Sequence, residues 1–290
     1  MNSHIPTLLL REWMQHKRGW LIAAFAPPIL FLAMLPFGHV QGLPTEHMEL
    51  MALGMLLLSA CVVFAICLLV ALFQLPGLAR RDAQDRSIEF WLSLPGRPSE
   101  SVASTVLAHA FLAPLGGAVV GALFGLPIAV MMLTSKADFG MAMSVHWGEV
   151  IKAALPVLAR GLAGTVPLVL WLSPLIFTLM AASAWLKRLG VPLVLVGGGV
   201  ATAVMHNVYG IDWPLDALQD LNLHLNHSLL YDARELMRAL QSETENSLVG
   251  PMLTDLGHSL AELASVSFMG WMAVAAAGFA LVVMKRARGA

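Results

Sequence analysis

The chain has 290 residues and a net charge of −1; 58% of its residues are hydrophobic and only 12% are charged. Ordinary soluble domains carry roughly 25% charged residues, so a soluble fold of this length could not bury so much apolar surface. We therefore expect an all-α integral membrane protein without a separate catalytic domain, because each spanning helix uses about 20 residues.

The first 19 residues are predicted to form an amphipathic helix. Ile5, Leu9 and Trp13 recur at near-helical spacing, while Arg11 and Glu12 point elsewhere. Such helices lie in the membrane interface, here on the cytoplasmic side. A plain extension of the first span is the alternative. Residues 20–290 are expected to form the membrane domain.

Six apolar stretches are predicted to span the membrane, with both chain ends in the cytoplasm. The region 150–186 as one helix would measure about 55 Å, more than the hydrocarbon core, so part of it must project or re-enter. Its Arg160 is interpreted as an ordinary snorkelling arginine. The expected spans are 20–37, 50–75, 102–133, a part of 155–186, 191–208 and 263–284.

The orientation follows from the basic residues, which favour cytoplasmic loops. With the N-terminus inside, the outer segments carry only five of the 17 Lys and Arg residues. The other twelve lie on the cytoplasmic side: Arg11, Lys17, Arg18, Arg80, Arg81, Arg86, Arg97, Lys187, Arg188, Lys285, Arg286 and Arg288.

Residues 209–262 form the longest outer region, and they are acidic. Within it, residues 227–241 have the pattern of an amphipathic helix, since Leu229, Leu236 and Leu240 recur on one side. The region is predicted to be an ordered helical cap or a re-entrant structure.

Small residues recur every four positions in the third span. They are Ala113, Gly117, Gly121 and Gly125. Such a stripe lets two helix backbones approach closely in lipid. The partner helix could belong to the same subunit or to a second copy.

Segment 76–100 is the polar stretch expected on the cytoplasmic side between the second and third spans. It sets charged side chains beside large apolar ones, a mixture that a solvated loop does not need. We interpret it as an interface helix that docks on a cytoplasmic partner. The residues expected at this interface are Asp82, Asp85, Arg86, Glu89, Phe90 and Trp91.

A family resemblance rests on the same segment. The stretch DRSIEFWLSLPGRP, residues 85–98, resembles the coupling segment of ABC-2 type transporter permeases, the membrane subunits of ABC exporters. The opening LLREW at 9–13, followed by HKRGW at 16–20, is similar to the start of those chains. The six-span plan and the long outer region before the last span agree with that family.

The resemblance implies a permease in the bacterial inner membrane that pairs with a second permease, more often a copy of itself than a different chain, and with a separate ABC ATPase subunit. ATP and magnesium would bind to that ATPase, because this chain has no G-x-x-x-x-G-K-[ST] loop. No cofactor, no nucleic acid and no catalysis are expected here. The lipid-exposed chain would move a hydrophobic or amphipathic cargo by alternating access, along a path lined by the second and fifth spans.

Three other functions are weighed against this one. A proton-coupled secondary transporter needs ionisable groups within the membrane, and His109 is the plausible candidate because no carboxylate lies at a span centre. A metal-ion transporter is suggested by His224 and His227, two imidazoles three residues apart. An intramembrane enzyme would need a dyad such as Ser59 with His109, which nothing in the sequence marks.

Overall fold

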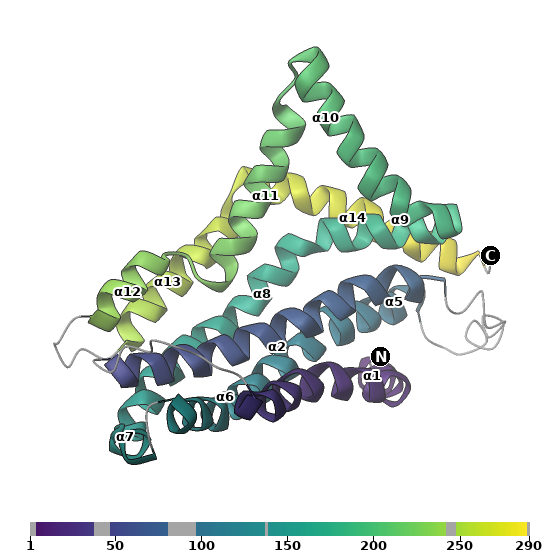
Figure 1. Cartoon of the computed structure of the whole chain (residues 1–290). Helices are drawn as coiled ribbons and strands as arrows, with labels where there is room; N and C mark the ends of the chain where they lie inside the picture. Colours follow the sequence, from purple (N-terminus) through teal and green to yellow (C-terminus); the bar gives the residue numbers. More distant parts are fainter. Residues whose placement is uncertain (1–3, 38–46, 81–96, 137–138, 242–247, 289–290) are drawn as a thin grey trace.

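The computed structural model describes residues 4–37, 47–80, 97–136, 139–241 and 248–288, and every regular element in these ranges is a helix (Figure 1). The all-α prediction is thereby confirmed. Within the described residues, five helical segments are long and apolar enough to cross a membrane, as an integral membrane protein requires. They are Ile5–Phe37, Met48–Leu78, Pro98–Ser135, Trp147–Tyr209 and Val266–Ala287.

The described residues contain α-helices joined by shorter helical turns. The α-helices are α1 (Ile5–Met34), α2 (Met48–Leu78), α5 (Pro98–Val106), α6 (Ala113–Lys136), α7 (Phe139–Ser144), α8 (Trp147–Leu186), α9 (Gly190–Pro192), α10 (Gly198–Tyr209), α11 (Trp213–Leu229), α12 (Ala233–Gln241), α13 (Val249–Ala261) and α14 (Val266–Ala287). Between them lie the 3₁₀ turns η1 (Leu35–Phe37), η4 (Lys187–Leu189) and η6 (Glu262–Ala264), and the π-helical turns η3 (Leu107–Leu112) and η5 (Leu193–Gly197).

The first helix is continuous across the boundary expected at residue 19. α1 runs for 30 residues and includes Gly19, Pro27 and Pro28. The structure thus joins the expected interface helix to the first span, which is the alternative named above. Whether residues 5–19 lie at a membrane surface stays a prediction.

The fourth apolar segment contains the fourth and fifth expected spans. α8 has 40 residues, about 60 Å at 1.5 Å per residue. The chain then turns at Lys187, whose φ is +57°. Gly190 lies so close to α8 that a Cβ there would be 2.1 Å from the carbonyl oxygen of Ala182. Residues 191–208 therefore form a second arm that begins against the end of the first.

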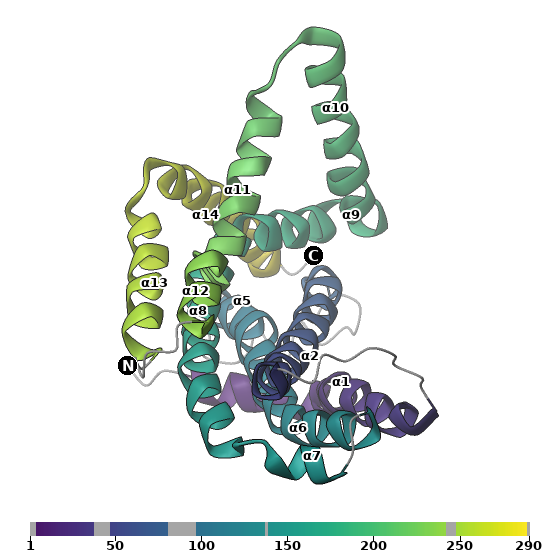
Figure 2. The ribbon, with the colours of Figure 1, turned by 60° about the vertical axis from the view of Figure 1, so that its left-hand side comes forward.

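The end of the fifth expected span and the first part of region 209–262 form a hairpin that stands away from the other helices. Figures 1 and 2 both show α10 and α11 as its two arms. Gly210 ends α10 in the left-handed conformation, with φ of +63°, which glycine adopts without steric cost. No residue of α10 is buried within the chain.

The predicted helix over residues 227–241 consists of two helices. α11 ends at Leu229, and α12 begins at Ala233 after a turn. The carboxylate of Asp232 accepts hydrogen bonds from the backbone N–H groups of Glu235 and Arg234, at 3.2 and 2.8 Å. These bonds lower the pKa of Asp232. Asp232 therefore acts as the N-terminal cap of α12.

Several helix ends gather at one end of the molecule. Figure 1 shows the start of α1, the end of α2, the start of α5, the α8–α9 turn and the end of α14 toward its right-hand side. The indole nitrogen of Trp185 in α8 donates to the Leu281 carbonyl of α14, at 3.2 Å. We call this the basic end, because Arg80 directly follows α2, Arg97 precedes α5 and Lys187 lies in the turn after α8.

The closest helix pair is α2 with α6, and the glycines of the stripe lie between them. A Cβ at Gly121 would be 2.6 Å from the carbonyl oxygen of Ser59, and one at Gly125 would be 2.7 Å from the Cα of Leu56. At Gly117 it would meet the sulfur of Cys67, also at 2.6 Å. The partner of these three glycines is thus α2 of the same chain. Ala113, the fourth residue of the stripe, begins α6.

Even a methyl group at Gly121 should disrupt this contact. We expect Gly121→Ala to destabilise the protein by about 1–3 kcal/mol, the usual cost of overpacking. Gly116→Ala is the matched control: it is in the same helix, and its Cβ would meet nothing within 4 Å. Thermal unfolding in detergent measures both. Equal melting temperatures for the two variants would show that α2 and α6 do not touch as described.

Candidate functional site

The residues expected at the ATPase interface lie outside the described residues. Asp82, Asp85, Arg86, Glu89, Phe90 and Trp91 all belong to the stretch 81–96. The described flanks are Arg80, which follows α2, and Arg97, which precedes α5. α5 in turn packs against α1 and α14. The segment therefore connects α2, which contacts α1, to α5, which contacts both terminal helices of the chain.

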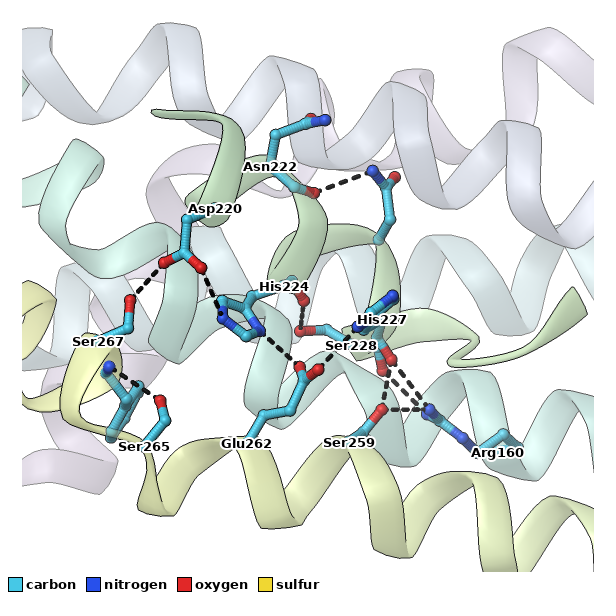
Figure 3. A network of polar contacts seen from close by, with 12 residues as sticks. Arg160, Asp220, Asn222, His224, His227, Ser228, Ser259, Glu262, Ser265 and Ser267 are labelled. Atoms are coloured by element: carbon cyan, nitrogen blue, oxygen red, sulfur yellow. Dashed lines mark hydrogen bonds and ion pairs between the residues drawn. The ribbon is translucent and has the colours of Figure 1, made fainter. Parts of the chain in front are cut away.

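A buried polar network ties α8 to the outer helices (Figure 3). At its centre is Arg160, whose Nε donates to Asp255 Oδ2 at 2.7 Å. Its Nη1 donates to the Ser228 carbonyl at 2.9 Å, and its Nη2 to Ser259 Oγ at 2.6 Å and to the His227 carbonyl at 3.2 Å. The residue is 3% exposed, so the expectation of a snorkelling arginine is wrong.

The partners of Arg160 are themselves held in place. Besides the guanidinium, the Asp255 carboxylate accepts the backbone N–H groups of Tyr231 and Asp232, at 3.1 and 2.9 Å. Gly164 lets α11 approach, because a Cβ there would lie 2.3 Å from the Ser228 carbonyl oxygen. A buried charge needs this degree of hydrogen bonding, since an unpaired one is costly. The network therefore fixes α11 and α13 on α8.

Beside this network, one carboxylate joins two histidines. Glu262 Oε2 lies 2.7 Å from His224 Nδ1, and Oε1 lies 2.7 Å from His227 Nδ1. The other ring nitrogen of His224 is 3.3 Å from Asp220 Oδ1, and Asp220 accepts a hydrogen bond from Ser267. Figure 3 shows this chain of contacts running from α11 to the start of α14.

The distances from Glu262 to His224 and His227 show whether these side chains are spaced for hydrogen bonds or for a metal ion. Two donor atoms bound to one tetrahedral zinc ion at 2.0–2.1 Å would lie about 3.3 Å apart. The separation of 2.7 Å between each Nδ1 and its Glu262 oxygen is that of a hydrogen bond instead. Trp171 also stacks on His224, with ring centroids 4.1 Å apart and planes 9° from parallel. His224 and His227 therefore donate hydrogen bonds to the Glu262 carboxylate and so join α11 to the segment that follows α13.

A second group of ionisable residues lies inside the molecule. His109, on η3, is fully buried, and its Nε2 lies 3.5 Å from Oε2 of Glu12, a residue of α1 that is also fully buried. The carboxylate of Glu12, from the segment expected at the membrane surface, thus lies beside His109, the residue named above for proton coupling. Ser59 is not the partner of His109; its hydroxyl donates to the Gly121 carbonyl, at 2.7 Å.

An apolar cavity of about 610 Å³ lies between α2, α6 and α8. Leu56, Phe64, Leu123 and Leu158 contribute to its wall, and Leu236 of α12 closes one side. No residue of 191–208 lines it, so the expected pairing of the second and fifth spans does not describe this cavity. Its volume is within the range of about 300–1,000 Å³ that small-molecule sites occupy.

The sequence reasoning missed Asp255, Ser259 and Glu262. These residues follow one another at spacings of four and three, which places them on one face of a helix. That pattern could have identified a polar face of α13. Glu12 was missed for a different reason, because one sequence cannot show that a charged residue near a chain end is covered by a helix almost 100 residues away.

Comparisons of the chain with known protein families, with curated proteins and with solved structures find no match.

Loss of the Arg160 side chain should loosen the outer helices. We expect Arg160→Met to cost about 3–5 kcal/mol, because Asp255 would stay buried without its cation. Lys152→Met is the matched control on the same helix; its ion pair with Glu149 is exposed and contributes less than about 1 kcal/mol. Thermal unfolding and limited proteolysis between α11 and α13 measure the effect. Unchanged cleavage in Arg160→Met would contradict the role of the network.

Proposed function

We propose that this chain is the transmembrane permease subunit of an ATP-driven ABC-2 type exporter. The observation that carries the proposal is the stretch at 85–98 together with the position of its flanks. Arg80 follows the end of α2 and Arg97 precedes α5, and Figure 1 shows these two helix ends on the same side as the start of α1, the α8–α9 turn and the end of α14. An ATPase that bound residues 82–91 would thus meet the ends of several helices at once.

The packing supports transmission of movement from that end. α5 follows the coupling segment and contacts α1 and α14, and α2, which precedes it, packs along α6 and α8. α8 in turn carries the outer helices through Arg160. A shift of α2 and α5 driven by ATP would therefore reach the far end through contacts between helices. This is the requirement of alternating access driven by a separate subunit.

The proposal includes six spans, with both chain ends in the cytoplasm of a bacterial cell. The two arms of Trp147–Tyr209 count as separate spans, because the chain turns between them at Lys187.

A second copy of the chain completes the pathway. The face around Gly198 and Gly199 supports such a contact, since a Cβ at either position would meet nothing within 4 Å. Lipid covers the remaining apolar surface.

The cargo is proposed to be hydrophobic or amphipathic. The wall of the cavity between α2, α6 and α8 is almost wholly apolar. The charged atoms of Arg160, which lines one edge, are occupied by Asp255 and by backbone carbonyls. A lipid chain or an apolar peptide or drug could be accommodated there, whereas an ion or a sugar would find no partners.

The topology can be tested by cysteine labelling from outside intact cells. Cys61 and Cys67 would first be replaced by serine, because Cys61 is exposed. A membrane-impermeant maleimide should then modify a cysteine introduced at Asp216 and spare one at Ala83, since the basic loops are proposed to be cytoplasmic. Modification of Ala83→Cys in intact cells would overturn the orientation.

Coupling can be tested by two substitutions in the segment. Trp91→Ala should weaken ATPase binding by about 2 kcal/mol, which is roughly 30-fold, because removing an aromatic anchor from an interface has a cost of this size. Glu89→Arg should reduce it further if the partner surface is basic, because like charges then oppose. The measurement is copurification of the ATPase and substrate-stimulated ATP hydrolysis.

The matched control for the charge reversal is Glu149→Arg, on an exposed site at the start of α8. It should insert, assemble and retain the ATPase. If Glu89→Arg and Trp91→Ala also retain it and transport normally, the segment is a solvated loop and the proposed function loses its main support.

A further inference from the structure

We propose that Glu12, His16 and His109 form a binding site for a zinc-class divalent cation inside the basic end. Glu12 and His16 are four residues apart on α1, so they lie on one face of that helix. His109 comes from η3, one of the two π-helical turns of the described chain. π-helical turns inside α-helices are frequent at functional sites. Three ligand atoms, one from each residue, lie within 4.8 Å of one another.

The separations fit a metal better than they fit hydrogen bonds. Oε2 of Glu12 is 3.5 Å from His16 Nδ1 and 3.5 Å from His109 Nε2. That is close to the distance of about 3.3 Å between two ligand atoms on a tetrahedral zinc ion. The separation of 2.7 Å between His224 Nδ1 and Glu262 Oε2 is instead that of a hydrogen bond. Of the two His–His–Glu groups in the described residues, this one has the spacing of a cation site.

The buried imidazole of His109 provides an independent observation. Neither of its ring nitrogens has a hydrogen-bond partner among the described residues. Buried polar atoms almost always have a partner, so an orphaned one calls for an explanation such as an ion. Trp20 packs edge-on against the same ring, with centroids 4.9 Å apart, and shields it on another side.

The carboxylate is held so that one oxygen points at the two rings. Oε1 of Glu12 accepts the guanidinium of Arg11 at 2.6 Å and the hydroxyl of Thr105 at 3.1 Å. Oε2 is then the oxygen that faces His16 and His109. Such outer contacts orient the ligands in known metal sites.

The ligand types select the ion. Two imidazoles and one carboxylate suit zinc and the neighbouring transition metals, whereas magnesium and calcium prefer oxygen ligands only. Nδ1 of His16 also lies 3.1 Å from the Glu12 carbonyl, so this ring must carry its proton on Nε2 when it binds an ion. The positive charge of Arg11 opposes the cation, and we therefore expect micromolar rather than nanomolar affinity.

A bound ion would join α1 to the helix that begins directly after the coupling segment. The site does not depend on the proposed transport function, and its test uses neither ATPase nor cargo.

The experiment is a titration of the full chain in detergent, purified without a polyhistidine tag and stripped of metal by a chelator. Wild type should bind one zinc per chain by elemental analysis, and one cobalt(II) with the intense visible absorption of a four-coordinate site. His109→Gln should weaken zinc binding at least tenfold. His224→Gln, which alters the other histidine group, is the matched control and should bind as wild type does.

Two further measurements complete the test. His16→Gln should also lose the cobalt absorption, and it changes a residue that is less buried than His109. X-ray absorption of the wild-type zinc complex should show nitrogen and oxygen ligands at about 2.0–2.1 Å. The proposal is overturned if wild type binds no zinc, if His109→Gln binds it equally well, or if His224→Gln is the variant that loses it.

Discussion

In a membrane, hydrophobic burial does not decide which helices pack together, because lipid tails are as apolar as leucine side chains. The arrangement of this chain therefore depends on close backbone approach and on polar groups that find partners only in another helix. The glycines of α6 provide the first kind of contact with α2. Arg160 provides the second, since its guanidinium joins α8 to α11 and α13 through four hydrogen bonds.

These contacts lie in two separate groups, one at each end of the molecule. At the far end, the Arg160 network and the Glu262 group hold the outer helices on α8. At the basic end, Glu12 joins α1 to Thr105 of α5 and lies next to His109. The apolar cavity lies against α2, α6 and α8, the helices that connect the two ends. The cavity therefore lies along the helices that join the two ends.

Composition and small-residue spacing predicted much of the fold. The helical class, the approximate spans and a close contact along Gly117, Gly121 and Gly125 are all visible in the sequence. The polar network was harder to predict because its residues are far apart in the chain: Arg160 and Asp255 are separated by 95 positions. The sequence alone suggested a snorkelling side chain at Arg160, because a single sequence cannot show which acidic residue neutralises it. The burial of Glu12 was missed for the same reason.

The central claim is that this chain works with a separate nucleotide-binding subunit. The most direct measurement is native mass spectrometry of the full chain, isolated in mild detergent from the membranes of its own cell, together with ATP hydrolysis by the same sample. The account predicts an assembly that contains a second polypeptide with a G-x-x-x-x-G-K-[ST] loop, and ATP hydrolysis inhibited by vanadate. An intact assembly made of this chain alone, without ATP hydrolysis, would contradict it.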